Sequence, residues 1–175
     1  MELLPRSYFF SYCLEETLIT CGIDPGLTNT GIAVTSGREL VFSETLRVRG
    51  LTVYEARTYF EALQSKYGIE KTGIERFASY RGVASSDTEN LLMFIGVLIS
   101  CMPSPQLVRA IDWKVQLSHR LYAEGFRNKA KSLDKTFSKD AAEFLLGKKL
   151  KSHHECDAVL LGYWRSLQED ASIKL

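Results

Sequence analysis

Apolar residues form short runs in the first part of the chain and helical patterns further on. Three short runs rich in β-forming residues, 18–24, 31–36 and 39–48, are separated by tight turns, the first at Pro25-Gly26. Strands joined by such short turns pair with their neighbours in the sheet. The pattern therefore predicts an antiparallel meander of three strands.

The rest of the sequence alternates between helical periodicity and two further strand-like runs. Apolar residues at helical spacing and capping boxes of the form Ser/Thr-x-x-Glu mark the helices. In chain order we predict a helix from Thr52 to about Lys66, a strand at 71–76, a helix at 90–101 after the capping box Ser86-x-x-Glu89, a strand at 106–111, and helices at about 113–122, 138–146 and 153–168, the last capped by Ser152 and Glu155. The polar, basic segment 125–136 predicts a mobile loop.

This order of elements predicts an α/β domain. Three antiparallel strands, then strands that alternate with helices, give a mixed five-stranded sheet with parallel strands on one side and helices on its faces. We expect one domain over residues 18–168, with an N-terminal extension at 1–17 and a C-terminal tail at 169–175.

Composition favours a water-soluble protein, with 45% hydrophobic and 25% charged residues. The longest apolar stretch, Leu91 to Met102, is shorter than the roughly 20 residues of a membrane span, and it predicts a buried helix. Residues 1–17 lack the pattern of a signal peptide. The four cysteines show no Cys-x-x-Cys spacing, which argues against a zinc knuckle or a redox pair. We expect a cytoplasmic location and no membrane partner; for a phage or viral protein this is the host cytoplasm, with an organelle as the alternative.

Basic residues are concentrated in one part of the chain, although the net charge is only +1. Residues 109–151 contain eleven Lys or Arg and five Asp or Glu, a local excess of six positive charges. Two interpretations fit this excess: a surface that faces a polyanion, and a solvated helical region.

Three acidic residues stand at the ends of predicted elements, beside apolar runs. Asp24 ends the first strand, Glu75 ends the fourth, and Asp157 lies in the first turns of the last helix. Each one alone is most often a turn, cap or strand-end residue, but strand ends and a helix start can converge on one side of a sheet. Carboxylates in such an arrangement suit Mg²⁺ or Mn²⁺ and metal-assisted phosphodiester hydrolysis. His154 shares a helix face with Asp157, so it is a candidate metal ligand or proton carrier, or else an exposed first-turn residue.

These segments resemble the motifs of RuvC-type Holliday junction resolvases, a group within the ribonuclease H-like superfamily. Asp24-Pro-Gly-Leu-Thr-Asn-Thr-Gly-Ile-Ala-Val34 is similar to the opening motif, Gly73-Ile-Glu-Arg-Phe77 to the second, and His154-Glu-Cys-Asp-Ala158 to the last. Their order and spacing agree over roughly residues 18 to 168.

The resemblance implies a ribonuclease H-like fold, a homodimer and a crossover junction endodeoxyribonuclease, of bacterial, organellar, phage or viral type. It would use two Mg²⁺ or Mn²⁺ ions per active site, and no nucleotide cofactor, to place paired symmetrical nicks in a four-way DNA junction. Asp24, Glu75, His154 and Asp157 would form the catalytic and metal-binding set. The DNA-binding residues would be Phe77, Tyr80, Arg81, Lys114, Arg127, Lys129, Lys131, Lys135 and Lys139, with Phe77 stacking on a base or packing under the next helix. The helix at 90–101 is the candidate dimer surface.

Other functions fit parts of the same pattern. One is a ribonuclease H-like nuclease that acts on other branched DNA or on structured RNA, although Pro25 favours the resolvase motif. Another is a junction-binding relative without catalysis. A sugar kinase or actin-like ATPase also begins with a strand and Asp-x-Gly, but it needs two such subdomains, and the chain has one copy.

Overall fold

Five strands form a single mixed sheet in this computed structural model, which describes residues 18–76, 85–127 and 132–168. β1 (Ile19–Asp24) pairs antiparallel with β2 (Asn29–Ser36), and β2 pairs antiparallel with β3 (Glu39–Arg47). On the other side of β1, β4 (Lys71–Arg76) and β5 (Pro105–Arg109) continue the sheet in parallel. The strand order β3-β2-β1-β4-β5 confirms the predicted mixed sheet.

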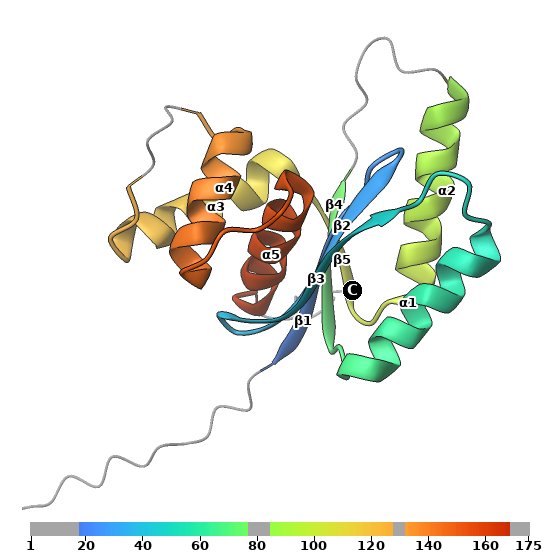
Figure 1. Cartoon of the computed structure of the whole chain (residues 1–175), viewed down its shortest axis with the longest axis horizontal. Helices are drawn as coiled ribbons and strands as arrows, with labels where there is room; N and C mark the ends of the chain where they lie inside the picture. The colour runs from blue at the N-terminus through green and yellow to red at the C-terminus, as the bar shows by residue number, and fades with distance from the viewer. Residues whose placement is uncertain (1–17, 77–84, 128–131, 169–175) are drawn as a thin grey trace, which may run out of the picture.

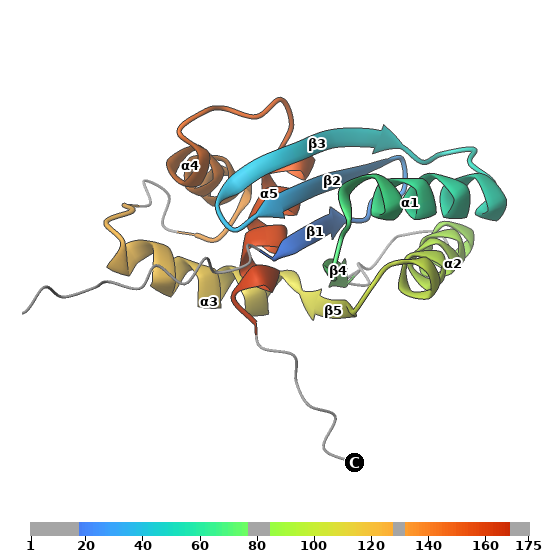
Figure 2. The same cartoon turned by 90° about the horizontal axis from the view of Figure 1, so that it is seen from below.

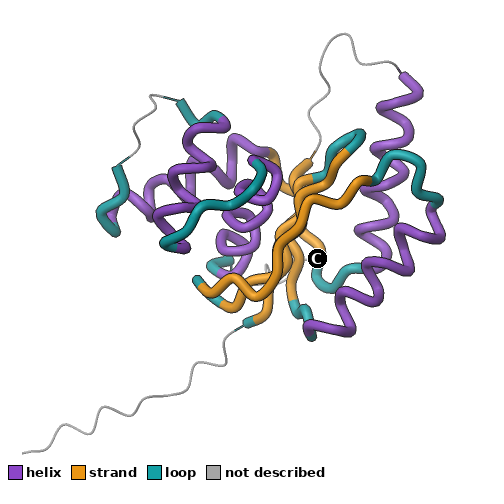
Figure 3. The backbone as a smooth tube through the Cα atoms, in the orientation of Figure 1, coloured by secondary structure: helices purple, strands orange, loops and turns teal. Residues whose placement is uncertain are grey.

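Helices cover both faces of this sheet. α1 (Val53–Tyr67) and α2 (Ser85–Cys101) lie on one face. α3 (Ala110–Ala123), α4 (Lys135–Leu146) and α5 (His153–Ser166) lie on the other face (Figures 1 and 2). The tube view in Figure 3 shows the resulting three layers, with the strands between two groups of helices.

Each face of the sheet carries its own hydrophobic core. Ile23, Ile32 and Ile74 point from the central strands toward Phe60 of α1 and Leu98 of α2. The opposite cluster joins the helices of the other layer, and its fully buried members include Trp113, Phe137, Leu160 and Leu161. Alternation along each strand thus sends apolar side chains to one layer and leaves the other face of the central strands for close contact with α5.

α5 lies directly on the backbone of β1 and β2. A Cβ atom at Gly22 would come within 1.9 Å of the carbonyl oxygen of Ala158, and one at Gly31 within 2.0 Å of that of His154. No side chain fits such a gap, so glycine is required at both positions for the helix to pack this closely. The start of α5 is thereby held against the ends of β1 and β2.

The helix starts were predicted with mixed success. The capping box at the start of α1 is confirmed, because Thr52 Oγ1 accepts a hydrogen bond from the Glu55 amide and Glu55 accepts one from the Thr52 amide. The predicted capping box at Ser86 is wrong, since α2 already begins at Ser85 and Ser86 lies in its first turn. α4 begins at Lys135, inside the predicted loop, because the Asp134 side chain caps it.

The boundary between β5 and α3 also differs from the prediction. The strand was expected to run to Ile111, but it ends at Arg109, whose extended backbone forms the N-cap of α3. The β-branched Ile111 resembles a strand residue in sequence; in the structure it is 54% exposed in the first turn of α3. A helix can thus start inside an apolar run when its first turn faces solvent.

α2 is buried on one side only, which corrects the prediction of a buried helix. Leu91 and Leu98 are buried, whereas Leu92 and Met93 are each 56% exposed and Ile99 is 42% exposed. The reason is that α2 is an outer-layer helix, so only one stripe of it reaches the sheet. Among the described residues, no helix combines the length and apolar character that crossing a membrane requires.

Candidate active site

The three acidic residues predicted from sequence lie at the same edge of the sheet. Parallel pairing of β1 with β4 matches Ile23 to Ile74, so the next residues, Asp24 and Glu75, follow at adjacent strand ends. α5 begins at this edge and brings His154 and Asp157, one turn apart, against the same strands. Segments separated by more than 50 residues therefore supply one polar cluster.

Asp24 is paired with His154. The Nδ1 atom of the imidazole lies 2.6 Å from Asp24 Oδ2, and the two side chains are 26% and 13% exposed. This hydrogen bond raises the pKa of His154 above its ordinary value, against the opposing effect of burial. The ring of His153 lies beside that of His154, with 4.0 Å between the centroids. His154 is thus a partly buried imidazole that favours its protonated form.

Glu75 receives a hydrogen bond from a tryptophan. The indole Nε1–H of Trp113, from α3, donates to Glu75 Oε2 over 3.0 Å. Burial and then the negative charges of Asp24 and Asp157 raise the pKa of Glu75 to about 7, while Lys114 and the indole donor act in the opposite direction. Asp24 and Asp157 are therefore close enough for their charges to disfavour the ionised form of Glu75.

Asp157 is held by two donors from α3 and α4. Lys114 Nζ lies 2.8 Å from Asp157 Oδ1, and each of these side chains is 10% exposed. Ser138 Oγ donates to the same oxygen over 2.6 Å, and Ser138 is fully buried. A charged amine and a hydroxyl thus both contact the Oδ1 atom of this carboxylate.

The donor set suits a hard divalent cation, because oxygen ligands from carboxylates are those that Mg²⁺ and Mn²⁺ prefer. In the described part of the chain, however, no three His, Cys, Asp or Glu side chains are grouped so that they could hold a metal ion as they lie. As they lie, Asp24 contacts His154, Glu75 contacts Trp113 and Asp157 contacts Lys114. The acids fit a metal ion by chemistry and by mutual repulsion, and binding would exchange some of these partners.

The residues predicted to contact DNA do not form one cluster in the described part of the chain. Lys114 lies inside the cluster, buried against Asp157. Arg127 turns back on its own segment and donates to the carbonyl oxygens of Tyr122 and Phe126. Lys135 and Lys139 are exposed on α4, one turn apart. Phe77, Tyr80, Arg81, Lys129 and Lys131 lie outside the described residues.

Two donors in the cluster were not assigned to it from the sequence. Trp113 is fully buried, and its indole nitrogen donates a hydrogen bond to Glu75. Ser138 carried no signal, because its contact with Asp157 depends on how α4 packs on α5.

No protein-family model and no curated protein matches the sequence. Solved structures of RuvC from Thermus thermophilus do match the fold. One, "T. thermophilus RuvC in complex with Holliday junction substrate", has a TM-score of 0.66 and 15% sequence identity, covering 84% of this chain and 92% of that one. Another, "Thermus thermophilus RuvC structure", has a TM-score of 0.60 and 16% identity, with the same coverage. The chain therefore has the ribonuclease H-like fold of RuvC, which confirms the fold that the motifs implied.

Proposed function

We propose that this chain is a metal-dependent endonuclease that resolves four-way DNA junctions. The observation that carries the proposal is the cluster of Asp24, Glu75, Asp157 and His154 at one edge of a sheet with the fold of RuvC. An ionised Glu75, buried and beside the charges of Asp24 and Asp157, costs folding stability. Such a cost is typical of a site that a cation completes.

Asp24, Glu75 and Asp157 would hold Mg²⁺ or Mn²⁺, with two ions per site, and the bound metal would activate water and stabilise the leaving oxygen of the cut phosphodiester. The protein supplies rigid positions for these acids, because two stand on neighbouring strands and one stands in the first turns of α5. The buried donors Trp113 and Ser138 fix the orientation of Glu75 and Asp157.

His154 is suited to the movement of a proton. Its hydrogen bond with Asp24 favours the imidazolium, and its side chain remains 26% exposed. A protonated imidazole at this position can donate to the leaving oxygen after the bond to phosphorus breaks. A role as metal ligand requires the neutral ring instead, so His154 is the member of the cluster with two possible roles.

The choice of DNA junctions as substrate rests on the fold and on the motifs. The RuvC structure with the higher TM-score contains a Holliday junction, and the segment from Asp24 to Val34 resembles the opening motif of those resolvases. Lys135 and Lys139, exposed on α4, can contact phosphates close to the site, where the charge of Lys135 acts on His154. Lys114 would reach phosphate only after leaving Asp157.

Paired nicks across a junction need two active sites, so we include a homodimer in the proposal. The exposed apolar side of α2, formed by Leu92, Met93 and Ile99, is the surface that a second copy would cover. Burial of these side chains would supply the apolar centre that stable interfaces contain.

The test is a cleavage assay with purified protein on a four-way junction, a linear duplex, a flap and a structured RNA. We expect symmetrical nicks in the junction in the presence of Mg²⁺ or Mn²⁺, and none in EDTA. Equal cutting of all substrates would contradict junction selectivity, and a preference for RNA would favour a different nuclease of this fold. Junction binding without any cutting would identify a catalytically silent relative.

A further inference from the structure

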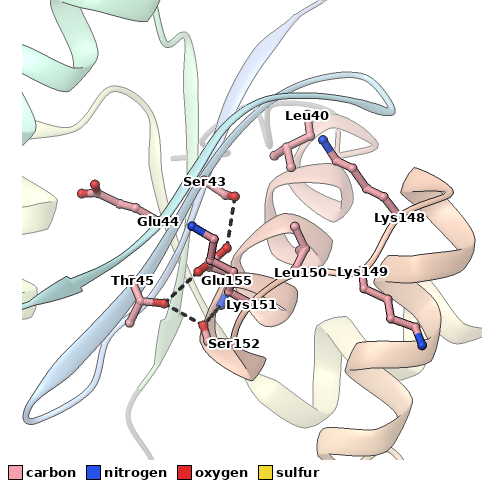
Figure 4. Close-up of a pocket in the computed structure, with 10 residues that line it drawn as sticks. All are labelled: Leu40, Ser43, Glu44, Thr45, Lys148, Lys149, Leu150, Lys151, Ser152 and Glu155. Carbon is pink, nitrogen blue, oxygen red and sulfur yellow. Dashed lines mark hydrogen bonds between the residues drawn. The ribbon is translucent and has the colours of Figure 1, made fainter.

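A groove with a basic rim lies beside the candidate active site, between β3 and the loop that joins α4 to α5. Its volume is about 700 Å³. β3 contributes Leu40, Ser43 and Thr45 to its lining, and the loop contributes Lys148, Lys149 and Lys151 (Figure 4). The first residues of α5 form the floor.

Hydroxyl groups hold the acidic residue in the floor of this groove. Glu155 is only 6% exposed, and its two carboxylate oxygens accept hydrogen bonds from Ser43 Oγ at 3.3 Å and Thr45 Oγ1 at 3.2 Å. Thr45 also bonds to Ser152, the N-cap of α5, over 2.6 Å. The other acid of the lining, Glu44, accepts a hydrogen bond from Tyr59 of α1. Both acids are therefore engaged by hydroxyl groups.

The lysines of the rim are free to meet a ligand. Lys148, Lys149 and Lys151 are all exposed, and within 18–76, 85–127 and 132–168 none of them makes an ion pair. Three like charges within four residues repel one another, and a polyanion relieves that repulsion. The lining thus favours a ligand with several negative charges in a row.

The groove is also in line with the candidate active site. Thr45 pairs with Gly31 across β2 and β3, and Gly31 pairs with Asp24 across β2 and β1. Two strand spacings, about 10 Å, separate Thr45 from Asp24. The phosphates of a helical DNA strand advance by about 3.4 Å per nucleotide along the helix axis, so this distance corresponds to about three nucleotides of axial rise.

We propose that this lysine groove binds the phosphodiester backbone of the DNA strand a few nucleotides from the bond that is cut. The inference rests on the proposed function, because it takes DNA as the substrate. It adds Lys148, Lys149 and Lys151 to the surface that positions the strand.

The test compares two double variants that remove equal charge. Lys148→Gln/Lys151→Gln alters the groove, while Arg57→Gln/Lys66→Gln removes two exposed charges from α1, in the other helical layer. Affinity for a fluorescent four-way junction is measured by anisotropy in EDTA at several salt concentrations. We expect the groove variant to bind about tenfold more weakly at moderate salt. The slope of the logarithm of its binding constant against the logarithm of salt concentration should be smaller in magnitude by about 2. The α1 variant should stay within about twofold of the unaltered protein.

Failure of this inference and failure of the proposed function give different results. If the unaltered protein nicks junctions but the groove variant keeps its affinity and salt slope, the groove does not hold DNA and the inference is wrong. A groove that binds an acidic peptide would give that same result. If the groove variant loses affinity and slope while the unaltered protein cuts no junction, the groove assignment holds and the nuclease assignment fails.

Discussion

His154 Nδ1 lies 2.6 Å from Asp24 Oδ2, so a residue of the last helix contacts the end of the first strand across 130 positions of sequence. We predict that Asp24→Asn abolishes metal-dependent nicking and leaves junction binding within about threefold, because the change removes the ligand charge but little shape. Cleavage is measured with Mg²⁺ and binding in EDTA. Cleavage retained by the variant would refute the role of Asp24.

Lys114 and Asp157 form a buried pair in which the amine occupies the place of a cation. Removing one partner of a buried pair leaves the other charge uncompensated, so Lys114→Gln should lower the free energy of unfolding by about 3–5 kcal/mol in EDTA. Added Mg²⁺ should recover part of this loss, because an ion then neutralises Asp157.

Urea unfolding with and without Mg²⁺ measures both effects. Lys66→Gln, on exposed α1 surface, is the control and should change stability by less than about 0.5 kcal/mol. If Lys114→Gln loses the same free energy of unfolding with and without Mg²⁺, the result would argue against metal binding at Asp157.

Glu75 makes the metal-free protein sensitive to pH. Its pKa in the folded state is about 7, above the ordinary value of 4.5, so the folded protein holds this proton more tightly than the unfolded chain. The stability that this protonation provides is complete below about pH 4.5 and is lost as pH rises through about 7. Glu75→Gln should therefore be more stable than the unaltered protein at pH 8, by up to about 3 kcal/mol in EDTA.

Thermal unfolding between pH 5 and 8 tests this prediction, with the exposed Glu39→Gln as control. The difference in melting temperature between Glu75→Gln and the unaltered protein should increase as pH rises. Parallel curves over this range would show that burial and the neighbouring carboxylates do not raise the pKa of Glu75.

Gly31 controls the position of the start of α5. In Gly31→Ala the new methyl group would meet the carbonyl oxygen of His154 at 2.0 Å, and backbone cannot move aside cheaply. We expect a loss of about 2–4 kcal/mol in stability and at least a hundredfold loss of cleavage, because the shift separates His154 from Asp24. Ser36→Ala, at the other end of β2, is the matched control and should be nearly neutral.

A substitution at Met93 tests whether the exposed apolar side of α2 forms a dimer interface. Met93→Glu places a charge on the exposed apolar side of α2, so the protein should pass from about twice its 19.8 kDa chain mass to a single chain. Tyr54→Glu, on α1 and 77% exposed, should leave the mass unchanged. Light scattering after size-exclusion chromatography gives both values, and a monomeric unaltered protein would exclude this interface.

The parts of the site that the sequence predicted are those that border an element. Asp24 and Glu75 end apolar strands, and Asp157 precedes an apolar helical face, so local pattern places all three at element borders that can converge. The same logic predicted the sheet, because turn signals and apolar runs specify each strand locally.

The parts that it missed depend on contacts between distant elements. Ser138 and Trp113 become partners of acids only through the packing of α4 and α3 on α5 and β4, which no local pattern encodes. The start of α4 was missed because Lys135 and Thr136 are polar, although Asp134 caps the helix and Phe137 is fully buried. The predicted end of β5 was wrong for a related reason: the exposed first turn of α3 contains the apolar, β-branched Ile111, which resembles a strand residue.

The glycine contacts between α5 and the sheet fix the spacing of the two through main-chain atoms alone. At Gly22 and Gly31 the separation of helix and strands is set by main-chain atoms that touch, and main-chain atoms are the same for every amino acid. The spacing of His154 and Asp157 from Asp24 therefore does not depend on which apolar side chains fill the surrounding layers. Those layers can exchange many residues while the geometry of the acidic cluster stays constant, provided that these glycines remain.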